Sequence, residues 1–365
     1  MTRSGFFQSG VAAALGAALL FGASTPFAKF LVGSVPPMLL AGLLYLGSGL
    51  GLLGWFGWRR LAARGKPAHE AALTRSDLPW LAGAILAGGV IGPVLLMLGL
   101  ARTGAATASL LLNLEAVLTA LLAWFVFREN FDRRIALGML LIVAGGVLLS
   151  RPGAIGGASL AALAIAGACL AWAIDNNLTR NVAAADPVQI AGLKGLIAGL
   201  VNTGLALALG DTLPGALTLS AAGAVGALGY GVSLVLFVLA LRHLGSARTG
   251  AYFSTAPFIG AAISLLVLRE TPDLLFWAAG GLMAAGVWLH LGERHAHRHE
   301  HEPLAHAHRH VHDEHHRHAH DFAWDGAEPH THFHVHAQLV HSHPHYPDIH
   351  HRHGHGKDRD DAGSA

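Results

Sequence analysis

Residues 100–129 read LARTGAATASLLLNLEAVLTALLAWFVFRE, and residues 241–270 read LRHLGSARTGAYFSTAPFIGAAISLLVLRE. With a shift of 141 residues and no gap, the two stretches align Gly104 with Gly245, and both close an apolar run with Arg-Glu. Chance similarity between Leu-, Ala- and Gly-rich segments is the alternative explanation, but an Arg-Glu pair at the end of such a run is not a low-complexity match. The two stretches therefore indicate a duplicated chain.

The duplication continues on both sides of these stretches. Beyond the Arg-Glu pairs, Leu141 meets Leu282 at the same shift. A second match, at a shift of 151 residues, sets an aromatic residue over an aromatic residue and a cation over a cation: Phe21 over Trp172, and Lys29 over Arg180. The matches divide the chain into a first repeat at 1–150, a second repeat at 151–292 and a remainder at 293–365.

Long apolar runs fill residues 1–292, which contain only 27 charged side chains, less than half the density usual in a soluble domain. The runs lack the polar face that a surface helix of a soluble protein needs. Most reach ~18–20 residues, enough to cross a hydrocarbon core of about 30 Å. The first run is too long for the apolar core of a signal peptide and is expected to be a retained span. The sequence predicts an all-α membrane protein with ten transmembrane helices, near 11–33, 36–57, 78–100, 103–127, 135–150, 158–177, 187–209, 218–241, 246–268 and 273–291.

The Lys and Arg residues between the runs predict the orientation. The N-terminus and the connections on its side hold twelve of them, whereas the opposite connections hold only Arg102, Arg151 and Arg269. Cytoplasmic loops carry the excess of Lys and Arg, so both termini of a ten-span chain are predicted to be cytoplasmic. Five spans per repeat is an odd number, so the two repeats have opposite orientations. Inverted repeats are usual in secondary transporters, with the substrate site near the midplane.

Small residues open the predicted fourth and ninth spans, and a Glu closes each of them. The two motifs are Ala101-Arg102-Thr103-Gly104-Ala105-Ala106 with Phe127-Arg128-Glu129, and Ala240-Leu241-Arg242-His243 with Leu268-Arg269-Glu270. With the five-plus-five plan, they make the chain similar, over about 11–291, to the EamA-type transporters of the drug/metabolite transporter superfamily. The resemblance implies a ten-helix bundle that moves small organic solutes or ions without ATP. The chain contains no G-x-x-x-x-G-K-[ST] phosphate loop, and we predict a transporter rather than an enzyme.

One departure from the family pattern lies inside the fourth span. The family commonly has a proline in its middle; the ninth span keeps it as Pro257, but Asn113-Leu114-Glu115-Ala116 occupies the equivalent stretch here. A charge at the bilayer centre is costly and more often marks a solute pathway than packing. Desolvation favours the neutral form of a carboxyl group, which suits a proton carrier or a switchable cation ligand. The alternative is a protonated Glu115 that only bonds a neighbouring helix.

A second polar cluster is predicted in the sixth and seventh spans. Asp175, Asn176 and Asn177 follow Trp172, and Lys194 lies on the next, antiparallel span. Counted from the turn at Asp186-Pro187, the depths of Asp175 and Lys194 differ by only about 6 Å at 1.5 Å per residue, so an ion pair between them is expected. A purely structural buried pair is the alternative to a role in the pathway. The predicted pathway residues are Glu115, Asn113, Asp175, Asn176, Lys194 and Trp172, with Asn202 a lesser candidate.

The remainder, 293–365, holds 23 of the 26 histidines, many in a His-x-His pattern. Such a segment buries too little apolar area to fold alone, so we expect it to be disordered without a ligand. Imidazole suits zinc, nickel, cobalt and copper, so these ions are the expected tail ligands; a solvated or pH-responsive tail is the alternative. The candidate metal ligands are His295, His297, His299, His301, His306, His308, His310, His312, His332, His334, His336, His343 and His345.

The functional hypothesis is a secondary transporter of the inner (plasma) membrane. Its specific form is export of divalent transition metals, with the tail as a cytoplasmic chelator or sensor. Export of a small organic metabolite, with a regulatory tail, is the first alternative, and a membrane-anchored metal buffer that transports nothing is the second. No cofactor is required. The expected partners are the lipid bilayer and a small solute or metal ion, with no nucleic acid, and a homodimer is left open. Cys169 is the only cysteine, so no intrachain disulfide can form.

Overall fold

The structure is a computed structural model, and it describes residues 3–62, 73–127, 133–150, 158–182, 185–291, 296–301, 304–310, 330–336 and 339–344. Residues 3–291 of this set are helical apart from short connections. The elements are α1 (Arg3–Val32), α2 (Pro37–Ala62), η1 (Arg75–Asp77), α3 (Leu78–Ala84), η2 (Ile85–Ile91), α4 (Gly92–Leu100), α5 (Ala105–Leu111), α6 (Leu114–Phe127), α7 (Arg133–Leu149), α8 (Ala158–Thr179), η3 (Arg180–Val182), α9 (Pro187–Ala208), α10 (Ala216–Gly226), η4 (Ala227–Val232), α11 (Ser233–Phe253), α12 (Ala256–Val267) and α13 (Leu274–Leu291).

Every predicted apolar run lies in helical structure. Within the described residues, seven helices are long and apolar enough to cross a membrane. Three further apolar helices are shorter, at Ala136–Leu149, Ala256–Val267 and Leu274–Leu289. The chain is thus an all-helical, multi-pass protein over 3–291, whereas the count of ten spans stays a prediction.

Two of the predicted spans contain a π-helical segment at the same place in the repeat. η2 covers Ile85–Ile91 and η4 covers Ala227–Val232, so a shift of 141 residues superimposes their C-terminal ends. The fourth and ninth runs are likewise broken, at 112–113 and at 254–255. The fourth run, which has no proline, is therefore broken in the same way as the ninth run, which contains Pro257. One expectation was wrong: the connection expected at 242–245 is helical and lies inside α11.

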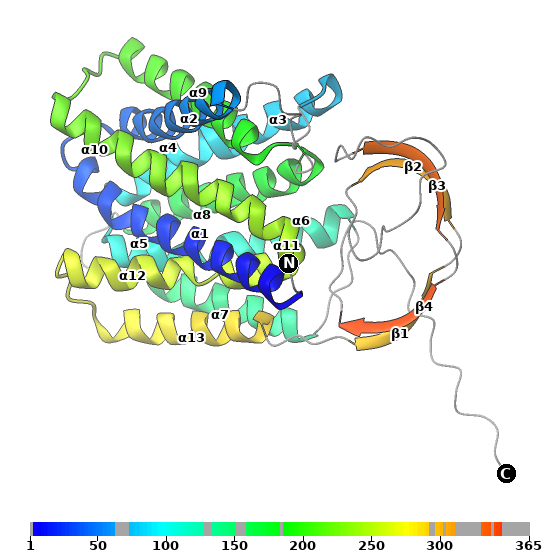
Figure 1. Cartoon of the computed structure of the whole chain (residues 1–365). Coiled ribbons are helices and arrows are strands. Elements are labelled where there is room, and N and C mark those ends of the chain that lie inside the picture. The colour runs from blue at the N-terminus through cyan, green and yellow to red at the C-terminus, as the bar shows by residue number, and fades with distance from the viewer. Residues whose placement is uncertain are drawn as a thin grey trace.

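The helices run lengthwise through the bundle, and the N-terminus lies at the end from which the chain continues after α13 (Figure 1). Helices α2 and α9 pack extensively against each other, and small residues let their backbones approach. A Cβ atom on Gly195 would lie 2.5 Å from the Gly49 amide nitrogen. This tight contact fixes the helix turn that carries Lys194. The core around it includes fully buried Leu39, Leu44 and Ile190.

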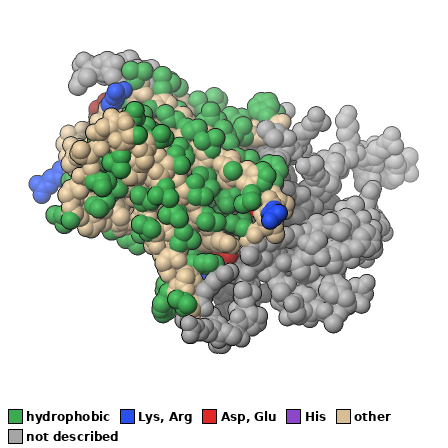
Figure 2. Space-filling view, turned by 90° about the horizontal axis from the view of Figure 1, so that it is seen from above, with side chains coloured by type: hydrophobic (Ala, Val, Ile, Leu, Met, Phe, Trp, Pro, Cys, Tyr) green, Lys and Arg blue, Asp and Glu red, His purple; other side chains and the backbone are tan. Residues whose placement is uncertain are grey.

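The outer surface of the bundle is apolar. Figure 2 shows hydrophobic side chains across the visible face, with Lys and Arg at its margins. Leu217 is 86% exposed, Trp288 69% and Phe125 68%. Soluble monomers rarely expose contiguous apolar patches larger than a few hundred Å². The exposed side chains therefore form a surface suited to lipid contact.

Four described segments of the tail are strands, whereas the sequence predicts disorder throughout 293–365. The structure has strands β1 (Ala296–His301), β2 (Leu304–His310), β3 (His330–His336) and β4 (Leu339–Pro344). β1 pairs antiparallel with β4, and β2 with β3, so that His306 is opposite His334 and His308 opposite His332. The disorder argument used composition alone, whereas a His-x-His pattern also has the two-residue period of a strand. His295, His312 and His345 lie outside the described residues.

The predicted orientation can be tested with fused reporters. A reporter placed after residue 292 should be active only in its cytoplasmic form, and one inserted near Gly210–Gly215 only in its external form. The physical reason is the excess of Lys and Arg on the side of the N-terminus. Alkaline phosphatase and fluorescent-protein fusions measure the two outcomes. An external signal from the fusion after residue 292 would refute the ten-span count.

Candidate functional site

A cavity that is partly open to solvent lies inside the helical bundle. Helices α1, α2, α6, α8, α9 and α11 and the π-helical segment η4 contribute its walls. Five of the six predicted pathway residues line it: Glu115, Trp172, Asp175, Asn176 and Lys194. A concave site lined mainly by apolar and aromatic side chains, with a few polar groups, is typical of small-molecule binding. The cavity is therefore the candidate functional site.

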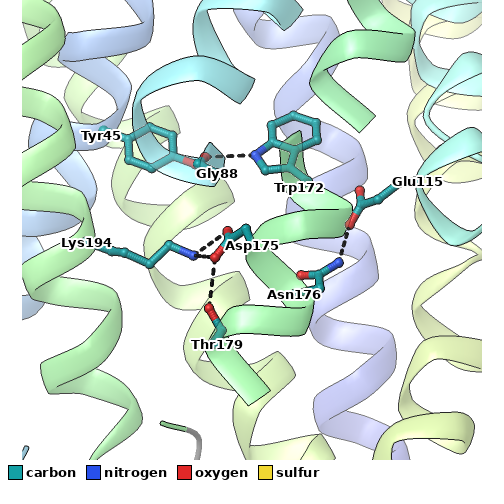
Figure 3. A network of polar contacts seen from close by, with 8 residues as sticks. All are labelled: Tyr45, Gly88, Glu115, Trp172, Asp175, Asn176, Thr179 and Lys194. Atoms are coloured by element: carbon teal, nitrogen blue, oxygen red, sulfur yellow. Dashed lines mark hydrogen bonds and ion pairs between the residues drawn. The ribbon is translucent and has the colours of Figure 1, made fainter. Parts of the chain in front are cut away.

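The expected ion pair between α8 and α9 is present. The Lys194 ammonium donates to both carboxylate oxygens of Asp175, at 2.6 Å to Oδ1 and 2.5 Å to Oδ2 (Figure 3). Each residue is only 5% exposed. The Thr179 hydroxyl, one turn along α8, donates to Oδ1 at 2.8 Å. Both oxygens of Asp175 thus have donors, as a buried carboxylate requires.

The carbonyl oxygen of Gly88 holds two aromatic side chains. The Tyr45 hydroxyl donates to it at 2.8 Å, and the Trp172 indole N–H at 2.9 Å (Figure 3). Gly88 belongs to η2, and the wide π-helical turn changes which backbone carbonyls are available to side chains. A Cβ atom at Gly88 would overlap the Asp175 carboxylate. The lack of a side chain at Gly88 therefore lets α8 and α2 both contact η2 at this residue.

Glu115 lies in the first turn of α6, directly after the break at 112–113. The Asn176 amide donates to its Oε1 at 2.8 Å (Figure 3). Within the part of the chain that the structure describes, Asn176 is the sole hydrogen-bond partner of the Glu115 carboxyl group. Glu115 is half-buried and faces the cavity. The two carboxyl groups of the site are thus unlike: Asp175 has a buried cation, and Glu115 has a neutral amide.

The other predicted polar residues do not line the cavity. Asn113 is buried, and its amide donates to the Leu110 carbonyl and toward the Met283 sulfur on α13. Asn113 is thus not among the residues that line the cavity, and its place in the pathway stays a prediction. Asn177 donates to Ala173 of its own helix. Asn202 donates to the carbonyls of Gly89 and Val90 and so holds η2 against α9.

Five aromatic residues that the sequence did not single out together line the cavity with Trp172. Phe21 is the hub, with ring centroids 6.0 Å from Trp172, 6.0 Å from Tyr230 and 5.4 Å from Phe253. The wall continues from Tyr230 to Tyr45 at 5.4 Å, and from Phe253 to Phe237 at 4.8 Å. The repeat alignment had paired Phe21 with Trp172 but gave no reason to expect contact. Here the two aligned residues touch.

A second polar arrangement closes the bundle at the opposite end from the N-terminus. The carboxylate of Glu270, just beyond α12, accepts from the amides of Ala105 and Ala106 at 2.7 and 3.0 Å. The Lys29 ammonium donates to the carbonyls of Leu100 and Thr103, both at 2.7 Å. These groups at helix ends lack partners within their own helices, and charged bonds to them are the strong kind. We name Lys29, Glu270 and the connection 101–104 the clamp.

The backbone beside Glu270 is strained. Arg269 has a φ of 53°, the only positive φ of a non-glycine residue in the described part of the chain. Such a conformation costs on the order of 1–3 kcal/mol and persists only where neighbouring contacts determine it. The bonds from Glu270 to the start of α5 are such contacts. The Arg-Glu pair that reveals the repeat is thus part of the clamp in the second half.

Comparison with known proteins gives the family. The sequence profile of the EamA-like transporter family matches residues 8–151 and again residues 159–292. The chain belongs to the EamA-like transporter family. The resemblance seen in the two span-end motifs is confirmed, and the chain is a multi-pass transporter of the membrane.

Two relatives and one solved structure show what this EamA-like transporter is similar to. An uncharacterized transporter of Methanothermobacter thermautotrophicus is 29% identical over 295 residues, which cover 75% of this chain and 83% of the relative. A probable 4-amino-4-deoxy-L-arabinose-phosphoundecaprenol flippase subunit, ArnE, of Pseudomonas paraeruginosa is 47% identical over 94 residues, covering 26% of this chain and 76% of the relative. A solved crystal structure with 19% identity matches with a TM-score of 0.57 over 77% of this chain and 96% of its own, which shows the fold alone.

Proposed function

We propose that this EamA-like protein is a secondary transporter that binds a small organic solute in the central cavity and releases it on either side of the membrane. The observation that carries the proposal is a buried polar site built from both family-matched halves of the chain. Phe21, Tyr45 and Glu115 come from the first half, and Trp172 and Lys194 from the second. Substrate sites of transporters with inverted repeats lie where the repeats meet.

Several features that coincide after a shift of 141 residues support this arrangement. The π-helical segments η2 and η4 both carry residues of the site: Gly88 in the first, Gly229 and Tyr230 in the second. Gly88 and Gly229 are equivalent residues at that shift. Phe21 and Trp172, which are aligned at the second shift of 151 residues, are also in contact. This contact fits a pseudo-twofold axis through the cavity, because equivalent residues can touch only near such an axis.

In the proposed transport cycle, the clamp holds one end of the cavity closed. It joins the end of α1, the connection after α4, the start of α5 and the end of α12 by four hydrogen bonds from two charged side chains. Opening that end of the cavity requires these bonds to break. In the repeat, Glu129 corresponds to Glu270, and we propose that it acts at the opposite end in the other state; Glu129 lies outside the described residues.

Removing the charge of Glu270 should loosen this end. In Glu270→Gln, hydrogen exchange of the amides in 101–111 should accelerate at least about tenfold, because bonds to charged groups contribute roughly 1.5–3 kcal/mol. Exchange mass spectrometry of the protein in detergent measures it. Asp273→Asn is the matched control, since Asp273 accepts from the Phe276 amide at 2.9 Å near the same end without touching α5. Equal exchange in Glu270→Gln and the unaltered protein would remove the clamp from the cycle.

An organic solute fits the cavity better than a bare metal ion. Lys194 and Thr179 occupy the Asp175 oxygens, and most of the remaining wall is aromatic or aliphatic. Metal export therefore ranks second as a function of the membrane part. The named substrate of the ArnE relative is an amino-sugar lipid, which agrees with an organic solute for this chain. Metal binding by the tail remains a separate proposal, which rests on the His-x-His pattern of the sequence.

Truncation after residue 292 tests both proposals. The shortened chain should keep solute flux in proteoliposomes, because the cavity lies wholly within 1–292. The full chain should bind several more Zn²⁺ or Ni²⁺ ions per molecule than the shortened one, and this difference should diminish below about pH 6 as imidazoles protonate. Calorimetry and metal analysis measure the ions. Loss of all flux on truncation would favour the membrane-anchored metal buffer, and equal metal content would refute a chelating tail.

A further inference from the structure

We propose that the cavity selects solutes that carry a positively charged amino group, which binds between the Glu115 carboxylate and the aromatic wall. This inference rests on the proposed transport function and names the chemical class of the solute. It is carried by two independent features of the cavity, its balance of charge and the orientation of its rings.

The charges that line the cavity do not cancel within the protein. Lys194 is paired with Asp175 through both carboxylate oxygens, which leaves an ionised Glu115 as the uncompensated charge among the lining residues. Its hydrogen bond from Asn176 comes from a neutral group. An unpaired charge in a low-dielectric site is costly unless a counter-charge reaches it. A cationic solute supplies that counter-charge, and its N–H groups can donate to the carboxylate.

The polar groups of two rings are already engaged. The Tyr45 hydroxyl and the Trp172 indole N–H both donate to the Gly88 carbonyl oxygen (Figure 3). These rings are thereby held in place, and their hydrogen-bond donors are not free for the solute. Phe21, Phe237 and Phe253 have no polar group. Cations are attracted to the faces of aromatic rings, so this wall favours the same charge as Glu115.

An anionic solute meets the reverse situation. A carboxylate or phosphate in the cavity would face Glu115 and Asp175, and the one lining ammonium, Lys194, already bonds Asp175 twice. Binding the anion through Lys194 would require breaking a buried ion pair, which is strongly unfavourable. A neutral solute avoids this repulsion but leaves Glu115 without a counter-charge. A protonated Glu115 would remove the preference for cations, and this is the competing reading.

Three probes of similar shape separate the classes: 2-phenylethylamine, 2-phenylethanol and phenylacetate. Thermal unfolding of the full chain in detergent at neutral pH reports their affinities, because a ligand of the folded state raises the midpoint. The amine should bind at least about tenfold more tightly than the alcohol, and phenylacetate should give no shift. Equal affinities, a preference for phenylacetate, or no shift with any probe would overturn the proposal.

Two variants locate the selectivity. Glu115→Gln should bring the affinities for amine and alcohol close together while leaving the midpoint of the ligand-free protein nearly unchanged. Phe237→Leu keeps an apolar side chain but removes a ring, and should weaken the amine about three- to thirtyfold with a smaller effect on the alcohol. An undiminished preference for the amine in Glu115→Gln would contradict the assigned role of the carboxylate.

Flux distinguishes this inference from the transport function itself. Proteoliposomes loaded with labelled 2-phenylethylamine should exchange it against external amine faster than liposomes without protein. A protein that moved phenylacetate or phenylethanol as fast as the amine would overturn the solute class and leave the transport function standing. Tight binding of the amine without exchange would support the solute class and refute the transport function.

Discussion

Glu115→Gln is expected to reduce transport to the rate of protein-free liposomes, with folding and abundance in the membrane nearly unchanged. Gln keeps the shape of the side chain and can still accept from Asn176, the bond that holds Oε1 at 2.8 Å. It cannot ionise, so it can neither bind a cation nor carry a proton. The substitution therefore separates the charge of Glu115 from its packing. Flux through proteoliposomes, normalised to inserted protein, is the measurement.

Two further variants make this result specific. Glu115→Asp shortens the reach by about 1.5 Å and should keep partial activity, because the charge remains. Asp211→Asn makes the same carboxylate-to-amide change in the connection after α9 and should leave flux unaltered. A structural Glu115 predicts the reverse pattern, in which Gln is tolerated and any loss follows the amount of protein in the membrane. Unaltered flux in Glu115→Gln would exclude the residue from the mechanism.

Lys194→Gln is expected to produce the largest loss of stability. Asp175 would then be a buried carboxylate, 5% exposed, without its cation. Breaking a buried ion pair by removing one partner costs about 3–5 kcal/mol, a large fraction of the stability of an ordinary domain. Thermal unfolding in detergent should show a much lower midpoint, or little folded protein at all. Arg59→Gln is the control: the Arg59 side chain, paired with Asp186 at 2.6 Å, is 43% exposed, and exposed pairs contribute at most about 1 kcal/mol.

The double variant Asp175→Asn with Lys194→Gln decides what the buried pair does. Two neutral amide side chains can hydrogen-bond each other without leaving an unpaired charge, so folding should recover substantially. If the pair also takes part in transport, flux stays low in the recovered protein. Recovery of both folding and flux would show that the pair is structural only. The sequence left these alternatives open, and the geometry at 2.5–2.6 Å is compatible with both.

The sequence by itself determined the helical membrane class, the repeat and most of the polar site. Apolar runs and the cost of charge in lipid depend on composition along the chain, so they can be read without coordinates. The depth argument that paired Asp175 with Lys194 succeeded because two consecutive antiparallel helices fix each other's register. The break at 112–113, next to Glu115, was not predicted, because no proline marks it.

Contacts between distant parts of the chain were decided only by the tertiary structure. Nothing local distinguishes Phe21, Tyr45, Tyr230, Phe237 and Phe253 from other aromatic residues of membrane helices. They become one wall only when the four elements α1, α2, η4 and α11 pack together. The clamp likewise joins Glu270 to amides 164 and 165 residues away. The span-end motifs of the sequence contain Gly104 and the Arg-Glu pair, but they do not indicate that these residues lie together in the clamp. The free backbone amides and carbonyls at helix ends cannot be recognised from the residue types around them. Which charged side chain forms hydrogen bonds with them therefore depends on how the helices are arranged.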